Sequence, residues 1–167
     1  AVIWRSCLYG TAVSLHQRFV LEEVNRDLDA NPITLISVVP TMLQRLVDSR
    51  NGWPATLRLI LLGGAAATPE LVAAANKLPR ARPLPKQPLP LDDPPAAIDP
   101  PPLVATTYGL TEAASQVATM LPRDVAAKPG SVGKPLLFTR VRVIDDHGRD
   151  LPPNAIGEIV VSGPSVM

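Results

Sequence analysis

The sequence predicts an α/β fold in which a mainly parallel sheet with flanking helices runs into a β-rich subdomain. Short apolar runs alternate with amphipathic segments up to residue 78 and are joined by short connections, which is the pattern of βαβ units. From residue 128 onward, alternating segments separated by glycine turns are typical of an antiparallel meander. We therefore expect part of an α/β subdomain over residues 1–127 and the start of a β-rich subdomain over 128–167.

Residue spacing and end signals predict the first elements. Val2 to Tyr9 is mostly apolar and is followed by Gly10, a suitable helix C-cap. Thr11 to His16 alternates in polarity and carries β-branched residues, which predicts a strand. Leu21 to Leu28 has apolar residues at positions i, i+3 and i+7. It is expected to be an amphipathic helix that is stopped by Asn31-Pro32.

Two strand–helix pairs follow. Ile33 to Val39 is a nearly continuous apolar run, which predicts a parallel strand covered on both faces, and Pro40 then begins a helix. Leu57 to Leu62 is a second buried-strand run. After it, Thr68 is a good N-cap residue, with Pro69 at the first position of another helix.

The segment from Pro79 to Pro102 holds half of the 20 prolines of the chain. Each proline removes a backbone donor and restricts the residue before it, so we expect an exposed, extended loop or a disordered insertion. Arg82, Pro85 and Pro88 match the spacing of a basic ligand for SH3-type grooves. In a segment with so many prolines, we favour a spacer in which the match to this ligand spacing arises by chance.

The meander is predicted from residue 128 onward. Lys128 to Pro135 is a loop rich in glycine and proline. Arg140 to Ile144 and Gly157 to Gly163 alternate in polarity, and Asp145 to Gly148 reads as the turn after the first of these strands. We expect charged residues on the solvent side of this meander and valines on the inner side.

Composition excludes several classes of protein. Sixteen basic and fifteen acidic residues give a net charge of +1, and no basic stripe with interleaved aromatics indicates nucleic-acid binding. With a single cysteine, Cys7, the chain cannot form an internal disulfide. Cys7 lies in the apolar run of the first predicted helix, and we expect it to be buried in the protein core. No apolar run is long enough to span a bilayer, and a signal peptide is not recognisable. A cytoplasmic protein is expected, and the lack of an initiating methionine suggests a partial sequence.

The polar cluster of the chain lies between Ala105 and Gln116. The apolar run Leu103 to Ala105 precedes it, so the cluster is expected where a buried strand ends, which is the edge of an α/β sheet that binds ligands. We expect that a planar base can lie between the small Gly64-Ala65 surface and the ring of Tyr108. Thr111 and Glu112 then have the groups to contact a phosphate and Mg²⁺. Neither a P-loop nor a GxGxxG pattern is present, and close packing of the Gly63-Gly64-Ala65 turn is the favoured alternative on the residues alone.

Three motifs in this order resemble the acyl- and aryl-CoA synthetases of the adenylate-forming superfamily. They are Gly63 to Ala66, Tyr108 to Glu112, and Gly157 to Gly163. Enzymes of this family make an acyl-adenylate from ATP and a carboxylic acid, and then transfer the acyl group to coenzyme A. Within the family, Ser37 to Leu46, Glu112 to Gln116 and Gly130 to Leu136 look like the o-succinylbenzoate–CoA ligases, which act in menaquinone or phylloquinone biosynthesis.

The resemblance implies a role for each matching residue. Tyr108 would contact adenine, with Gly63, Gly64 and Ala65 lining the adenine and acyl pocket, and Thr107 and Gly109 beside the cofactor. Thr111 would bind the α-phosphate and Glu112 the Mg²⁺, which makes these two the expected catalytic residues. Ser115 and Gln116 would lie near the aromatic acid. ATP, Mg²⁺ and coenzyme A are the implied cofactors and co-substrate.

The resemblance covers the middle of a family member. Two family features that precede this region are absent from the sequence: the phosphate loop and the histidine-bearing loop. The features that follow it in the family are absent as well, namely the ribose-binding aspartate, the hinge and the lysine-bearing C-terminal domain. We therefore expect a central fragment that is inactive alone, with a small carboxylic acid, ATP and CoA as partners of the parent enzyme and its oligomeric state open. The alternatives are another acyl- or aryl-CoA synthetase, a peptide-synthetase adenylation domain, or a non-catalytic module that binds a partner through its proline-rich segment.

Overall fold

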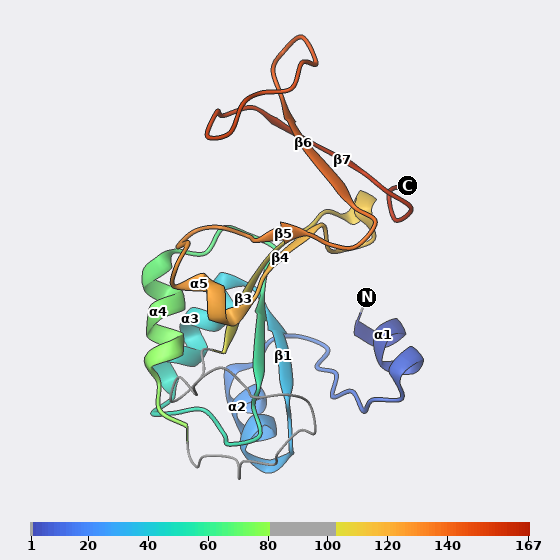
Figure 1. The fold of residues 1–167 in the computed structure, drawn as a ribbon. Helices are drawn as coiled ribbons and strands as arrows, with labels where there is room; N and C mark the ends of the chain where they lie inside the picture. The colour runs from blue at the N-terminus through green and yellow to red at the C-terminus, as the bar shows by residue number, and fades with distance from the viewer. Residues whose placement is uncertain (1, 81–102) are drawn as a thin grey trace, which may run out of the picture.

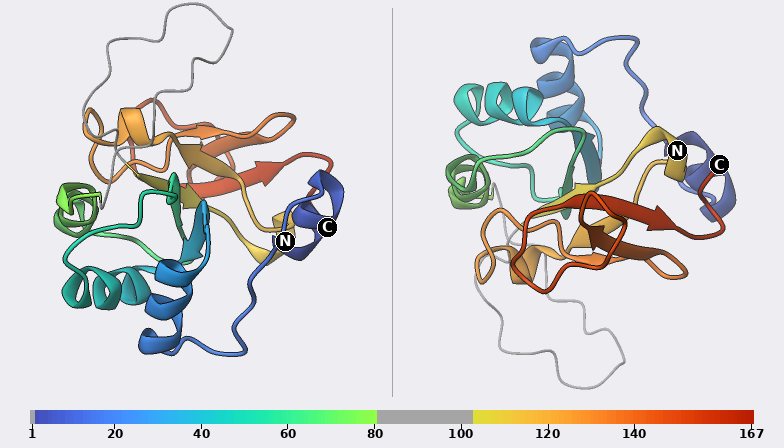
Figure 2. Two further views of the ribbon diagram at one scale, coloured as in Figure 1. Left: turned by 90° about the horizontal axis from the view of Figure 1, so that it is seen from below. Right: turned by 90° about the horizontal axis from the view of Figure 1, so that it is seen from above.

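The computed structural model describes residues 2–80 and 103–167 of the chain. A five-stranded sheet with the order β1-β2-β3-β4-β5 forms its centre, and a separate two-stranded sheet, β6-β7, extends from it (Figure 1). Helices α3 and α5 lie on opposite sides of the central sheet (Figure 2). The predicted α/β class and the change to antiparallel strands near the end of the chain are both confirmed.

The parallel half of the sheet contains β1 (Leu35–Val38), β2 (Leu59–Leu62) and β3 (Val104–Tyr108). Their register aligns Val38 with Leu62 and Leu62 with Thr106, so the three strands end close to one level. Helix α3 (Pro40–Ser49) connects β1 to β2, and α4 (Pro69–Lys77) follows β2. The helices begin where prolines predicted, because the fixed φ of proline suits the first helical position.

The other half of the sheet is antiparallel and was not predicted from the sequence. Strand β4 (Ala118–Met120) pairs with β3, and β5 (Lys134–Pro135) pairs with β4. A short helix, α5 (Pro122–Val125), follows β4. Strands of two or three residues are too short for an alternating pattern to identify. The proposed subdomain boundary at 127/128 stays a prediction, and β5 on its far side still belongs to the five-stranded sheet.

The second sheet is the predicted antiparallel meander. Strands β6 (Arg140–Ile144) and β7 (Glu158–Ser162) pair along five residues each. Asp145 stabilises the turn after β6, because its Oδ1 accepts hydrogen bonds of 2.9 Å from the backbone N–H groups of His147 and Arg149.

Helices α1 (Val2–Tyr9) and α2 (Leu21–Ala30) form where the sequence predicted them. The expected strand at Thr11 to His16 is wrong: these residues form no ladder, and two of them instead bind the side chain of Asp27 on α2. The expected burial of Cys7 is also wrong, since Cys7 is exposed on α1, a helix that leaves Leu8 82% exposed. Local patterns predicted these features, but within the described residues Thr11 to His16 pairs with no strand, and Cys7 lies on an exposed side of α1.

Most buried side chains of the hydrophobic core lie on the parallel strands and on helices α2, α3 and α4, and Met120 of β4 and Val125 of α5 also belong to it. Each fully buried large apolar side chain contributes about 1.5–3 kcal/mol of transfer free energy. The indole N–H of buried Trp53 donates a 2.8 Å hydrogen bond to the carbonyl of Ala75, which ties the loop before β2 to α4. Strand β1 is an edge strand with Leu35 43% exposed, so the predicted cover on both of its faces is wrong. The buried core side chains are Leu28, Val38, Leu43, Leu46, Trp53, Leu57, Ile60, Leu62, Leu71, Val72, Ala75, Leu103, Val104, Met120 and Val125.

The proline-rich segment with Arg82, Pro85 and Pro88 lies outside the described residues, apart from Pro79 and Arg80 at its start. In the described part of the chain, no helix is long and apolar enough to cross a membrane.

Candidate functional site

The carboxyl ends of β1, β2 and β3 meet at one edge of the sheet, as the sequence predicted. The backbone N–H of Gly63 donates a 3.2 Å hydrogen bond to the carbonyl of Val38, which joins the ends of β1 and β2. Because Leu62 is paired with Thr106, the next residues, Gly63 and Thr107, lie side by side. This edge therefore brings together the Gly63-Gly64-Ala65 turn and the Thr107-Tyr108-Gly109 strand end.

Gly63 is needed for close packing between two strand ends. A Cβ atom at this position would overlap with Oγ1 of Thr107, whose hydroxyl donates a 3.2 Å hydrogen bond to the carbonyl of Leu62. At Gly63, the glycine therefore serves close packing of the two strands, which was the alternative to a ligand-binding turn in the sequence analysis.

Gly64 and Ala65 behave differently from Gly63. Gly64 has a φ of +81°, a conformation that favours glycine, and both residues are exposed. They present a small, open surface beside the half-buried Tyr108 strand end. The N-terminus of α4 follows, where Oγ1 of Thr68 caps the backbone N–H of Leu71 at 3.3 Å.

The loop between β3 and β4 carries the hydroxyl and the carboxylate of the predicted site. The carbonyl of Tyr108 accepts a 2.8 Å hydrogen bond from the N–H of Val117, which closes the loop at its base. Thr111 to Ala113 forms a single 3₁₀ turn, labelled η1, in which Ala113 is buried. Thr111 and Glu112 are exposed, so the buried alanine anchors a turn whose polar side chains face solvent.

The end of this loop folds back onto Gly109. A Cβ atom at Gly109 would overlap with the backbone carbonyl of Ser115. Ala114 and Ser115 both have positive φ angles, 50° and 96°, which cost free energy for residues with a side chain. A locally unfavourable backbone thus brings Ser115 and Gln116 back beside Gly109.

Thr119 was not among the residues predicted from the sequence, yet it contacts one of them. Nε2 of Gln116 donates a 3.2 Å hydrogen bond to Oγ1 of Thr119 on β4. The loop after α5 contacts the neighbouring strand β3, because Oγ1 of Thr106 donates a 2.8 Å hydrogen bond to the carbonyl of Ser131. Gly133 also lies so near the Thr119 carbonyl that a Cβ atom would overlap with it. No sequence pattern marks Thr119, because β4 itself was too short to predict.

The carboxylate of Glu112 has the chemistry to bind Mg²⁺ together with the phosphates of a nucleotide. Within residues 2–80 and 103–167, no three histidine, cysteine or acidic side chains gather in a way that could hold a metal ion. Mg²⁺ commonly binds one or two carboxylates together with the phosphates of a substrate, and the single exposed carboxylate of Glu112 matches that requirement. The backbone carbonyl of Glu112 is fixed by a 2.8 Å hydrogen bond from the N–H of Met167.

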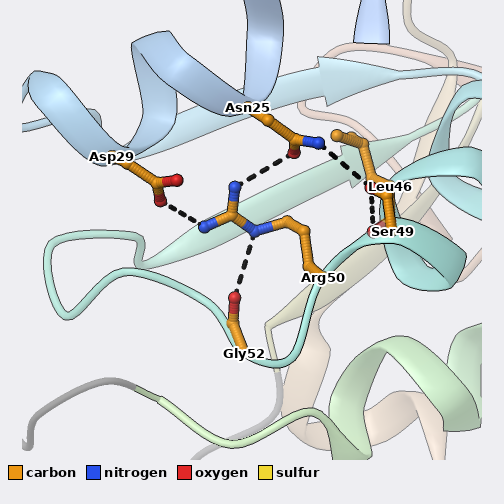
Figure 3. Close-up of polar contacts among 6 residues, drawn as sticks. All are labelled: Asn25, Asp29, Leu46, Ser49, Arg50 and Gly52. Carbon is orange, nitrogen blue, oxygen red and sulfur yellow. Dashed lines mark hydrogen bonds and ion pairs between the residues drawn. The ribbon is translucent and has the colours of Figure 1, made fainter. Parts of the chain in front are cut away.

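A pocket of about 670 Å³ lies elsewhere, beside the loop that leads into β2, and contains none of the predicted site residues. Arg50 is one of its lining residues, and its side chain is only 9% exposed. Figure 3 shows how the guanidinium is used: it binds Asp29, donates to Asn25 Oδ1 at 3.0 Å and donates to the carbonyl of Gly52 at 3.0 Å. Arg50 therefore links α2 to the loop after α3.

Comparison with known proteins gives a consistent result. The profile of the AMP-binding enzyme family matches residues 1–167. A 2-succinylbenzoate–CoA ligase of Bacillus licheniformis is 36% identical over 167 residues, and the corresponding ligases of Bacillus subtilis and Enterococcus faecalis are 35% and 30% identical. In each case the match covers 100% of this chain, which spans about 30% of the length of these curated relatives.

Solved structures agree with the sequence relatives. The o-succinylbenzoate CoA synthetase of Bacillus subtilis in complex with its acyl-adenylate superposes with a TM-score of 0.81, at 34% identity over 99% of this chain and 30% of that one. The same enzyme with ATP and magnesium gives a TM-score of 0.80, at 33% identity and the same coverage. An amide bond synthetase of Marinactinospora thermotolerans gives 0.71 at 27% identity, over 94% of this chain and 28% of that one.

Proposed function

This chain belongs to the family of AMP-binding enzymes, and from that membership we propose that it is part of an o-succinylbenzoate–CoA ligase. Such an enzyme would adenylate the carboxylate of o-succinylbenzoate with ATP and then form its CoA thioester, in menaquinone or phylloquinone biosynthesis. The observation that carries the proposal is identity of 30–36% along the whole chain to ligases with this substrate. The position of Gly64 just after β2, of Tyr108 at the end of β3, and of Thr111 and Glu112 in the turn that follows β3 supports it.

The chain's own residues would bind the nucleotide and orient its phosphates. The exposed Gly64-Ala65 surface and the ring of Tyr108 would hold adenine, while Gly63, Thr107 and Gly109 keep the strand ends and the loop in place. The hydroxyl of Thr111 would donate a hydrogen bond to the α-phosphate. During adenylation, negative charge moves from this phosphate onto the leaving pyrophosphate, and the hydrogen bond would stabilise the transition state. Glu112 would bind Mg²⁺, and this ion, when bound, would offset the charge of the departing pyrophosphate.

The acid would lie beside the end of the same loop. We place Ser115 and Gln116 against the aromatic acid, because the fold of the loop brings both residues back beside Gly109. Coenzyme A would enter as the second acceptor of the acyl group. We expect the parent enzyme to act in the cytoplasm, and we expect the isolated chain to be inactive because it spans about 30% of its relatives.

Pyrophosphate release by the full-length parent protein tests the proposed substrate. With ATP, Mg²⁺ and o-succinylbenzoate we expect turnover and thioester formation. Turnover with a fatty, cinnamic or amino acid, and none with o-succinylbenzoate, would assign the parent to another branch of the family. Absence of pyrophosphate release with any carboxylic acid would contradict the proposal. Thioester formation by the isolated chain would contradict its expected inactivity.

Glu112→Gln in the parent protein tests the metal role. The substitution keeps the size of the side chain and removes its charge, so we expect a large drop in turnover with little change in the melting temperature. A collapse of stability instead would mean that Glu112 is a structural residue.

Deletion of residues 81–101 separates the ligase from a module that recruits a partner. These residues lie outside the described part of the chain. The ligase proposal predicts that adenylation survives the deletion. Loss of all function, with the fold retained, would favour the partner-binding alternative.

A further inference from the structure

The side-chain amide of Gln116 is held by a residue on the neighbouring strand. Its Nε2 atom lies 3.2 Å from Oγ1 of Thr119, and both residues belong to the hairpin formed by β3 and β4. A glutamine side chain that is free in solution loses up to about 2 kcal/mol of rotamer entropy when a ligand fixes it. A hydrogen bond made before the ligand arrives removes part of that cost.

Thr119 is a well-fixed anchor for this amide. It is paired with Thr107 on β3 and with Lys134 on β5, so ladders hold it on both sides. Its carbonyl is packed against Gly133, where no Cβ atom fits. Its β-branched side chain also has few χ1 rotamers. The hydroxyl of Thr119 therefore has little freedom to move.

Gln116, in contrast, follows the least favourable backbone of the hairpin. Ser115 beside it has a φ of 96°, and the carbonyl of Ser115 lies against Gly109. This geometry brings Gln116 back toward the strand end but does not fix the direction of its long side chain. The contact with Thr119 supplies that direction.

Resting on the proposed function, we propose that Thr119 is a positioning residue for recognition of the aromatic acid. Its hydroxyl orients the Gln116 carboxamide, and the oriented amide then contacts the acid. The residues assigned to adenine and phosphate lie in the turn after β2, at the end of β3 and on η1, whereas the hydroxyl of Thr119 binds Gln116. The effect of Thr119 is therefore confined to the acid.

Steady-state kinetics of the full-length parent protein test this assignment. Thr119→Val removes the hydroxyl but keeps the shape of the side chain, and we expect a rise of about 3- to 10-fold in KM for o-succinylbenzoate, the effect of one neutral hydrogen bond. We expect an unchanged KM for ATP. Thr119→Ser retains the hydroxyl and should restore the wild-type KM for the acid. Thr119→Ala is a second variant without the hydroxyl, for use if Thr119→Val folds poorly.

Two further variants show whether Thr119 acts through Gln116. Thr106→Val removes a hydroxyl from β3 that binds Ser131 and not Gln116, so the KM for the acid should stay unchanged. In a Gln116→Ala background, Thr119→Val should add no further effect. An equal rise in both KM values, an effect that persists without Gln116, or a wild-type KM in Thr119→Val would each overturn the assignment. Those results leave the ligase proposal intact, whereas absence of pyrophosphate release by the wild-type protein contradicts the ligase proposal itself.

Discussion

Gly63 and Thr107 lie in direct contact where β2 and β3 end, and no Cβ atom fits between them. The hydroxyl of Thr107 is already committed to the carbonyl of Leu62. At the candidate site, the ends of β2 and β3 are thus packed together through a glycine and a hydrogen-bonded threonine. A larger side chain at position 63 has to displace Thr107 and break its hydrogen bond.

Gly63→Ala is therefore expected to destabilise the protein by about 1–3 kcal/mol, which is typical of overpacking at a tight contact. Thr107→Ala in the same molecule should relieve the overlap, so the combined effect should be smaller than the sum of the two single effects. Urea denaturation of the parent protein and its three variants measures this coupling. Additive effects would mean that the two side chains do not compete for space.

Gly109→Ala is expected to damage activity more than stability. The added Cβ atom would overlap with the backbone carbonyl of Ser115, and a backbone atom cannot rotate away as a side chain can. The loop with Thr111 and Glu112 must shift, and we expect adenylation to fall by about tenfold or more, as for other misplacements of reacting groups. Gly148→Ala is the control, because no atom lies within 4 Å of its added Cβ and its cost is the backbone strain of a φ of +76° in the turn after β6. Equal activity of both variants would contradict the prediction.

Arg50→Met is expected to lower the free energy of unfolding by about 1–3 kcal/mol, because it removes charge-assisted hydrogen bonds from a largely buried side chain. Arg142→Met is the matched control. Its ion pair with Asp150 measures 2.7 Å, but the two side chains are 52% and 67% exposed, and exposed pairs contribute about 0–1 kcal/mol. Chemical denaturation compares the two variants. An equal loss in both would show that the Arg50 contacts contribute no more than a surface pair.

The pH dependence of stability should reflect Asp27. The hydrogen bond from Ser14, at 2.6 Å, holds the pKa of this carboxyl below its ordinary value of 3.8, and Asn31 and His16 act in the same direction. A lowered pKa in the folded state means that Asp27 stabilises the fold above about pH 4 and that this contribution is lost as the pH falls through the folded-state pKa.

Ser14→Ala tests this dependence. The difference in unfolding free energy between wild type and Ser14→Ala should be largest near pH 6 and should shrink toward pH 3. In an Asp27→Asn background, where no proton is exchanged, the effect of Ser14→Ala should not vary with pH. A difference of constant size from pH 6 to pH 3 in the wild-type background would contradict the role of Asp27.

Elements with long, regular patterns were the ones that the sequence predicted well. The apolar spacing of Leu21 to Leu28 and the Thr68-Pro69 start signal gave helices close to their true positions. The strand expected at Thr11 to His16 did not form, because a strand also needs a partner that local sequence does not specify. The burial expected for Cys7 also failed, because an apolar run of residues does not specify which side of its helix packs against the rest of the protein.

The sequence by itself determined the α/β class, the two βαβ units and the residue types at the candidate site, because periodicity and helix capping act over a few residues. Only the tertiary structure decided which of those residues meet. In the folded chain, Gly63 packs against Thr107. Two positive φ angles bring Ser115 next to Gly109. Gln116 forms a hydrogen bond with Thr119, which lies on a strand of three residues. The physical reason is that these contacts depend on strand register and on packing between segments, and neither leaves a local pattern in the chain.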